Sequence, residues 1–277
     1  MDQRITEAQI DAGGINTHYL YGGQGAPILF LHGVPSSSYL WRNVMAPLAN
    51  DFSVFAPDLP GFAKTESPPE YGLMDCSAWL TDFHKAVCEN QKINLVVHDA
   101  GGPIGLHFTL EHPEIVSRLI VMDTLISEKN RSITMRLVMS PPALWAYYHL
   151  LNKGLFGSLM RSSVHQKNKL ASDALEEYYK VFRRDKRDRT SAKLLEKIRL
   201  EIDDLVGNRL HTIDCPTLVL WAEKDSFLTL TVAEGIQGQI KGATLKTLPD
   251  CGHFSQEEEP ELIARHTKDF CAPNSLL

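Results

Sequence analysis

The sequence predicts an α/β fold in which a mostly parallel sheet is flanked by helices and interrupted by a helical insertion. Short apolar runs alternate with helical segments over residues 1–126, and the alternation resumes over residues 213–277. Between them, residues 127–212 contain no strand-like run and are rich in Leu, Met, Tyr and basic residues. We therefore expect one core built from the two outer segments, with residues 127–212 inserted as a helical cap.

The strands are predicted from short apolar runs bounded by turn residues. Residues 4–21 are expected to form two strands around the glycine pair 13–14, and six more runs follow at 27–31, 52–57, 94–98, 118–122, 216–221 and 244–248. Apolar residues at helical spacing predict a helix over 75–90, and a second helix is expected over about 101–111. Parallel strands need such crossover helices, so both faces of the sheet should be covered.

Composition limits the classes of partner. The 277-residue chain is 43% hydrophobic and 22% charged, as expected for a packed globular protein, and its net charge of −6 shows no overall basic surplus. We therefore expect a small-molecule partner and no nucleic acid or membrane. Five scattered cysteines without a C-x-x-C pair favour a cytoplasmic location and no metal site. The first residues lack the apolar core of a signal peptide. The oligomeric state does not follow from composition.

Asp99 stands at the most informative position. Residues 94–98 form an apolar run, Ala100, Gly101 and Gly102 make a corner of small residues, and a helical segment follows. This is the strand–turn–helix context of a nucleophile elbow, with Asp in the place of the nucleophile. A carboxylate attacks saturated carbon and leaves an alkyl ester on the enzyme. The alternative is that Asp99 caps the following helix.

Two further polar residues follow predicted strands. Asp225 comes after the run at 216–221, and His253 comes after the run at 244–248. Nucleophile, acid and histidine thus occur in the order Asp99, Asp225, His253, each just beyond a strand end, which predicts a triad at one sheet edge. His253 would activate water against the ester, and Asp225 would orient the imidazole. Asp123, after the run at 118–122, remains an alternative orienting acid.

The segment His32-Gly33-Val34-Pro35 follows the apolar run at 27–31. A turn at this place directs the Val34 N–H toward the nucleophile, and the Ala100 N–H would be a second donor to the oxyanion of ester hydrolysis. The alternative is a simple turn, because Gly-x-Pro forms turns in many settings.

These motifs resemble those of the epoxide hydrolase and haloalkane dehalogenase group of α/β-hydrolase fold enzymes. The resemblance spans nearly the whole chain through residues 32–35, 98–102, 221–225 and 252–254, and residues 127–212 correspond to that group's cap. It implies a nucleophilic Asp99, the base His253 and the acid Asp225. It also implies that no cofactor or metal is needed.

Two departures favour epoxide hydrolase within this group. Haloalkane dehalogenases hold halide with a Trp after the nucleophile and an Asn in the first loop, whereas this chain has Ala100 and Val34. Epoxide hydrolases use cap tyrosines to bind and protonate the epoxide oxygen. Tyr147, 48 residues after Asp99, stands at the expected place for one of them, with Tyr148 beside it.

The expected second tyrosine is absent from residues 190–197. For the earlier pair Tyr178 and Tyr179, packing in the core is the favoured interpretation. Epoxide hydrolases often have Gly at the position of Val97, and here the chain resembles the dehalogenases instead.

The resulting prediction is an epoxide hydrolase that forms a vicinal diol from a small hydrophobic substrate, with the catalytic residues Asp99, His253, Asp225 and Tyr147. Val34, Ala100, Trp145 and Tyr148 are the predicted substrate-binding residues. Trp145 is expected to belong to an apolar roof over the pocket, together with Leu137, Met139, Leu144, Leu151 and Phe156. The alternatives are a haloalkane dehalogenase with the same triad, or a catalytically silent ligand-binding module of the same fold.

Overall fold

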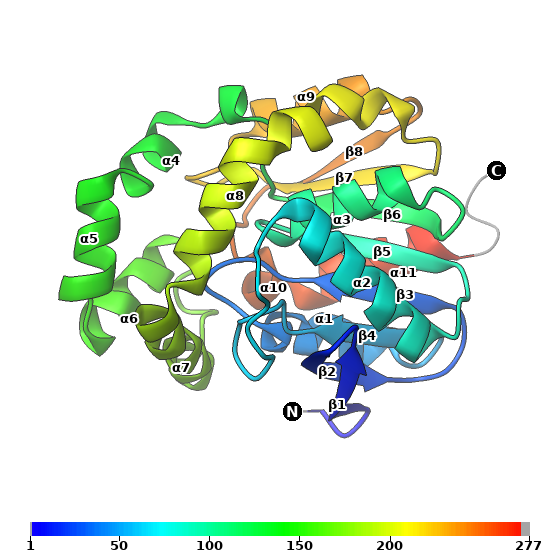
Figure 1. Ribbon diagram of the computed structural model, residues 1–277, viewed down its shortest axis with the longest axis horizontal. Helices are drawn as coiled ribbons and strands as arrows, with labels where there is room; N and C mark the ends of the chain where they lie inside the picture. Colours follow the sequence, from blue (N-terminus) through cyan, green and yellow to red (C-terminus); the bar gives the residue numbers. More distant parts are fainter. Residues whose placement is uncertain (1, 273–277) are drawn as a thin grey trace.

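The computed structural model describes residues 2–272, except the side chains of Asn130 and Val138, and is built around an eight-stranded sheet (Figure 1). Its strand order is β1-β2-β4-β3-β5-β6-β7-β8. Strand β2 runs antiparallel to β1 and β4, and all other neighbouring strands are parallel. The strands are β1 (Ile5–Ala12), β2 (Ile15–Gly22), β3 (Pro27–Leu31), β4 (Ser53–Pro57), β5 (Ile93–His98), β6 (Val116–Met122), β7 (Thr217–Ala222) and β8 (Thr244–Leu248). The predicted α/β fold with a mostly parallel sheet is confirmed.

Helices cover both faces of the sheet. On one face lie α2 (Leu73–Cys88), α3 (Gly101–Glu111) and α9 (Leu230–Gln239), which share one hydrophobic cluster. On the other lie α1 (Arg42–Leu48) and α11 (Pro260–Cys271), which contact each other, with the short α10 (Ser255–Glu258). Every residue of β5 is buried, as expected for a central strand between two helical layers.

Five helices lie between β6 and β7, within the segment 127–212 that we call the insertion: α4 (Ile133–Val138), α5 (Pro141–Leu150), α6 (Lys153–Ser162), α7 (Ser172–Asp188) and α8 (Thr190–Leu205). In Figure 1, α4 to α7 lie together to the left of the sheet. Helix α8 leads back to the core and contacts α2 and α3. Short 3-10 turns are η1 (Ser38–Trp41), η2 (Glu128–Asn130) and η3 (Gly207–Thr212). Residues 273–277 of the second predicted core segment lie outside the described residues.

Buried polar contacts fix the insertion to the core. The Tyr178 hydroxyl donates to Glu257 Oε1 at 2.5 Å, and the Arg42 guanidinium donates to both oxygens of the same carboxylate at 2.6 and 2.9 Å. The neighbouring Glu258 accepts the Gly252 N–H at 2.6 Å and the Gln166 N–H at 2.5 Å. The loop that precedes His253 is therefore connected to the insertion through Glu258. Tyr178 belongs to a buried hydrophobic cluster, so its predicted packing in the core is confirmed.

One prediction for the insertion fails at a single residue. Residues 183–189 carry charges of both signs, which predicts a solvated helix face. Arg183 and Arg187 are exposed as expected, whereas Asp185 is only 2% exposed. Its side chain accepts the Ser191 N–H at 2.7 Å and so connects the end of α7 to the first turn of α8. A charge pattern gives the polarity of a helix but not the place where a second helix covers it.

Candidate active site

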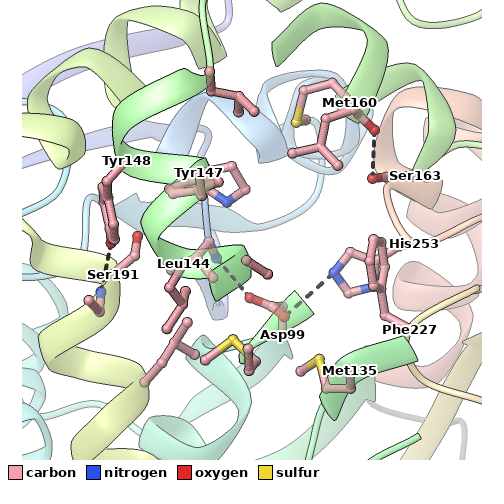
Figure 2. Close-up of a pocket in the computed structure, with 18 of the residues that line it drawn as sticks. Asp99, Met135, Leu144, Tyr147, Tyr148, Met160, Ser163, Ser191, Phe227 and His253 are labelled. Atoms are coloured by element: carbon pink, nitrogen blue, oxygen red, sulfur yellow. Dashed lines mark hydrogen bonds and ion pairs between the residues drawn. The ribbon is translucent and has the colours of Figure 1, made fainter. Parts of the chain in front are cut away.

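Asp99 occupies a sharp corner between β5 and α3. Its φ of 48° lies in the left-handed region, which is strained for a residue with a side chain and is typical of a nucleophile elbow. The backbone is held there because the Thr124 hydroxyl and the Gly102 N–H both donate to the Asp99 carbonyl, at 2.6 and 2.9 Å. The corner directs the Asp99 carboxylate into a pocket (Figure 2).

One carboxylate oxygen of Asp99 is held by backbone. The Val34 N–H donates to Asp99 Oδ1 at 2.7 Å. A Cβ atom at Gly33 would overlap the Asp99 carboxylate, so this close approach requires glycine. His32 fixes the turn: its Nε2 accepts the Leu59 N–H, so its Nδ1–H donates to the Gly33 carbonyl at 2.8 Å.

The predicted second donor belongs to Ala100. This residue is buried directly after Asp99, at the N-terminal cap of α3. Its part in stabilising an oxyanion stays a prediction.

His253 lies between two carboxylates. Its Nδ1 is 2.7 Å from Asp225 Oδ2, and its Nε2 is 3.5 Å from Asp99 Oδ2. Asp225 is fixed in turn, because its Oδ1 accepts the backbone N–H groups of Phe227 and Leu228 at 2.7 and 3.0 Å. The structure thus brings together the three residues that the sequence places after separate strands.

The two carboxylates determine the charge of the imidazole. Burial alone lowers the pKa of His253, but Asp225 and Asp99 together raise it well above its ordinary value. Burial alone raises the pKa of Asp99, but the hydrogen bond and charge of His253, with the Val34 N–H, bring it below its ordinary value. In the resting site, Asp99 is therefore an anion beside a protonated His253.

Asp123 has different surroundings. Its Oδ1 accepts the Ala222 N–H at 3.0 Å, and no partner of Oδ2 is found among the described residues. Burial, with the nearby charge of Asp225, raises the pKa of Asp123 well above its ordinary value. Of the two acids that the sequence leaves open, Asp225 is therefore the one bonded to His253.

His98 contacts the backbone of His253. Its Nε2–H donates to the His253 carbonyl at 3.0 Å, and burial lowers the pKa of His98 to about 4. Near neutral pH the ring is uncharged. It therefore positions His253 without competing for its proton.

A cavity of about 360 Å³ lies between the triad and the insertion. Residues of the insertion, mainly Leu, Met and Ala, form most of its lining. Phe227 and Phe254 lie with their ring centroids 5.4 and 5.2 Å from that of His253. Its polar lining comprises Asp99, Tyr147, Tyr148, Ser163, Ser191 and His253. Among the described lining residues, none is Lys, Arg, Asn or Trp.

Tyr147 and Tyr148 both line the cavity from α5. The Tyr147 hydroxyl lies 3.5 Å from Asp185 Oδ2, while the Tyr148 hydroxyl accepts the Ala192 N–H at 3.1 Å. Burial, reinforced by the charge of Asp185, raises the pKa of Tyr147 well above its ordinary value. Burial and the charge of Asp185 also raise the pKa of Tyr148, so both phenols keep their protons. Tyr147 is a hydrogen-bond donor with a long, weak bond to its present acceptor.

Trp145 is not part of the cavity. Leu144, Tyr147 and Tyr148 turn inward from α5, so the intervening Trp145 faces outward, 56% exposed and stacked on His149. The apolar roof predicted from the sequence is correct in part: Met139, Leu144 and Leu151 line the cavity, whereas Leu137 is exposed and Phe156 packs against Tyr179 and Phe182.

Several lining residues were missed by the sequence reasoning. Phe227 and Phe254 carry a usable signal, because each stands within two residues of a triad member. Met135, Met160 and Ser191 carry none, since only the packing of the insertion turns them toward Asp99.

Known proteins resemble this chain over most of its length. It is 26% identical to a soluble epoxide hydrolase of Corynebacterium sp. (strain C12), with 99% of each chain covered. It is 28% identical to a haloalkane dehalogenase of Agrobacterium fabrum, with 92% of this chain and 88% of the relative covered. The solved structure of the epoxide hydrolase CorEH superimposes with a TM-score of 0.76 at 22% identity, covering 97% and 99% of the two chains.

The family model described as the alpha/beta hydrolase fold matches residues 26–260. This range contains strands β3 to β8, the Asp99 corner, Asp225 and His253. With most of the chain matched, this protein belongs to the alpha/beta hydrolase fold family.

Proposed function

We propose that the protein is an epoxide hydrolase that opens an epoxide to a vicinal diol through an ester on Asp99. The observation that carries this proposal is a carboxylate at the elbow with a histidine–aspartate pair beside it, facing an apolar cavity that also holds a phenol. Relatives named epoxide hydrolase support it.

The two oxygens of Asp99 have different surroundings, which assigns them different roles. Oδ1 is held by the Val34 N–H, so Oδ2 attacks the less hindered ring carbon and the C–O bond of the ring breaks. The electron pair passes to the epoxide oxygen, to which Tyr147 donates its hydrogen bond. Oδ1 becomes the carbonyl oxygen of the ester, already placed at a backbone donor.

The ester changes the charge around His253. Attack removes the negative charge of Asp99, which is one of the two groups that raise the pKa of His253. The imidazolium then releases its proton, and one proton is what the new alkoxide needs to become a hydroxyl group. Neutral His253 next takes a proton from water, and the resulting hydroxide attacks the ester carbonyl. The C–O bond to the alkyl group breaks, the departing alkoxide takes the proton of the new Asp99 carboxyl, and the diol leaves the Asp99 anion beside protonated His253.

The cavity limits the substrate to a small, uncharged, apolar molecule. Its volume of about 360 Å³ lies near the small end of the range typical of ligand pockets, about 300–1,000 Å³. Among the described lining residues, the His253 imidazolium is already balanced by Asp99 and Asp225, and no Lys or Arg is present to offset an anionic substrate. A cytoplasmic location and the absence of a cofactor requirement are part of the same proposal.

The second candidate is haloalkane dehalogenation, which the haloalkane dehalogenase relative supports. Against it, no Trp or Asn lines the described cavity to receive a halide. The test is to incubate the protein with uncharged alkyl epoxides and with 1-haloalkanes of matched length, and to measure diol and halide. Diol formation supports the proposal; halide release without diol from any epoxide overturns it in favour of the second candidate.

A further inference from the structure

The outer surface of α4 to α6 is unusually apolar. Five large hydrophobic side chains are exposed there: Ile133, Leu137, Trp145, Leu150 and Leu155. Over the rest of the described chain only three others are similarly exposed: Tyr21, Met74 and Leu200. Exposed apolar residues that gather in one segment, rather than scatter singly, indicate a surface for interaction.

Helix α5 carries this surface most clearly. Its ten residues include no Lys, Arg, Asp or Glu. The inward side, with Leu144 and Tyr147, lines the cavity, while Trp145 and Leu150 on the outward side are 56% and 57% exposed. A helix that is apolar on both sides is normally covered on both sides. Within the described chain, nothing covers the outward side.

The charge of the same segment indicates which kind of partner binds this apolar surface. Residues 129–170 contain seven Lys or Arg and no Asp or Glu, although the whole chain has a net charge of −6. Three of these cations pair with carboxylates from outside the segment: Arg131 with Glu128, Lys153 with Glu176 and Lys169 with Glu259. No ion pair is found for Lys129, Arg136, Arg161 or Lys167 in the described part of the chain. The overall charge therefore conceals a local basic surplus.

We propose that the outer surface of α4 to α6, with the cations of residues 129–170, docks on an anionic lipid surface. Exposed Trp and Leu side chains beside Lys and Arg are the combination that enters a lipid–water interface, the apolar groups below the headgroups and the cations against the phosphates. A second copy of the chain is a poor cover for the same surface, because it would bring seven cations against seven without a carboxylate from either segment.

The proposal goes beyond the reaction at Asp99 and does not depend on it. Docking would nevertheless place helices that line the cavity, through Met135, Leu144 and Leu159, next to the phase in which apolar molecules dissolve. The expectation of no membrane partner is drawn from the net charge, which averages this segment with an acidic remainder.

The chain contains its own probe for the test. Trp41, Trp79 and Trp221 are at most 3% exposed, so Trp145 is the tryptophan whose emission reports contact with lipid. The full chain is mixed with vesicles of phosphatidylcholine alone, or of phosphatidylcholine with phosphatidylglycerol, and bound protein is measured by co-sedimentation. We expect binding and a blue-shifted emission with the anionic vesicles only, both reversed by high salt.

Matched variants separate the two contributions. Leu137→Ser and the double variant Arg136→Glu/Lys167→Glu should each lower partitioning by about tenfold or more. Leu200→Ser removes a leucine of similar exposure on α8 and should leave partitioning unchanged. Trp145→Phe should still bind but lose the emission shift. Circular dichroism of each variant checks that it is folded.

Four results would overturn the proposal. The first is no binding to anionic vesicles, and the second is equal binding to both vesicle types. The third is an equal loss of binding for Leu137→Ser and Leu200→Ser. The fourth is a blue shift of Trp145 that rises with protein concentration without vesicles, together with a dimer by light scattering, which would assign the surface to a second copy.

Discussion

Asp225 is bonded to His253 through one oxygen at 2.7 Å and to two backbone N–H groups through the other, so the side chain has no freedom to turn away. Asp123 also follows a strand end, but its bonded oxygen accepts the backbone of Ala222 instead. The geometry therefore ranks two acids that the sequence leaves open.

This ranking predicts the effect of two substitutions. Asp225→Asn should lower turnover by about 10⁴-fold, because the imidazolium loses its counter-charge and the imidazole its fixed tautomer. Asp123→Asn should lower turnover by less than about tenfold, since Asp123 is bonded to the Ala222 N–H rather than to His253 and burial raises its pKa, which favours the neutral carboxyl. Both side chains keep their shape, and steady-state rates on one substrate compare them. A larger loss for Asp123→Asn would transfer the role to Asp123.

The pH dependence follows from the charge of His253. Hydrolysis of the ester needs the neutral imidazole, so its rate should fall as the pH drops through the pKa of His253 in the ester form. In Asp225→Asn, a carboxylate that raises this pKa is lost, and the acidic limb should move to lower pH even though the maximum rate is smaller. Single-turnover hydrolysis between about pH 5 and pH 9 measures the acidic limb of the unmodified protein and of the variant. An unmoved limb would show that another group controls the step.

Tyr147 distinguishes the two substrate classes. Tyr147→Phe removes one hydroxyl and should slow alkylation of Asp99 by an epoxide by about 10²-fold, because negative charge develops on the epoxide oxygen. An alkyl halide has no such oxygen, so any alkylation by a halide should change little. Rapid-quench measurement of ester formation gives both rates. Equal effects on the two substrates would place Tyr147 outside the reacting atoms.

Asp185 gives a prediction about stability. Burial raises its pKa, so the folded protein holds this proton more tightly than the unfolded chain, and stability is lost as the pH rises from the unfolded toward the folded pKa. Asp185→Asn keeps an oxygen for the Ser191 N–H and removes the charge. The gain in melting temperature should therefore be larger at pH 7 than at pH 4, with about 2–4 °C for each kcal/mol relieved. A gain independent of pH would mean that the carboxyl is not the cause.

The sequence was sufficient for the core because local patterns decide it. Each apolar run between turn residues became a strand, and parallel strands bring their carboxyl ends together, so Asp99, Asp225 and His253 converge without any knowledge of their contacts. The insertion is different. Whether Trp145 faces the cavity, or Asp185 meets solvent, depends on the rotation and packing of whole helices, which residue patterns over ten positions do not fix.

The covalent step on Asp99 is the central claim, and His253→Ala tests it most directly. This variant keeps the nucleophile and its backbone donor at Val34 but loses the base that activates water, which slows ester hydrolysis by about 10²–10⁴-fold. After incubation with an uncharged alkyl epoxide, mass spectrometry should find the Asp99 peptide heavier by the full mass of the epoxide, and Asp99→Asn/His253→Ala should show no such adduct. A His253→Ala protein that binds the epoxide but never carries this added mass would contradict the account.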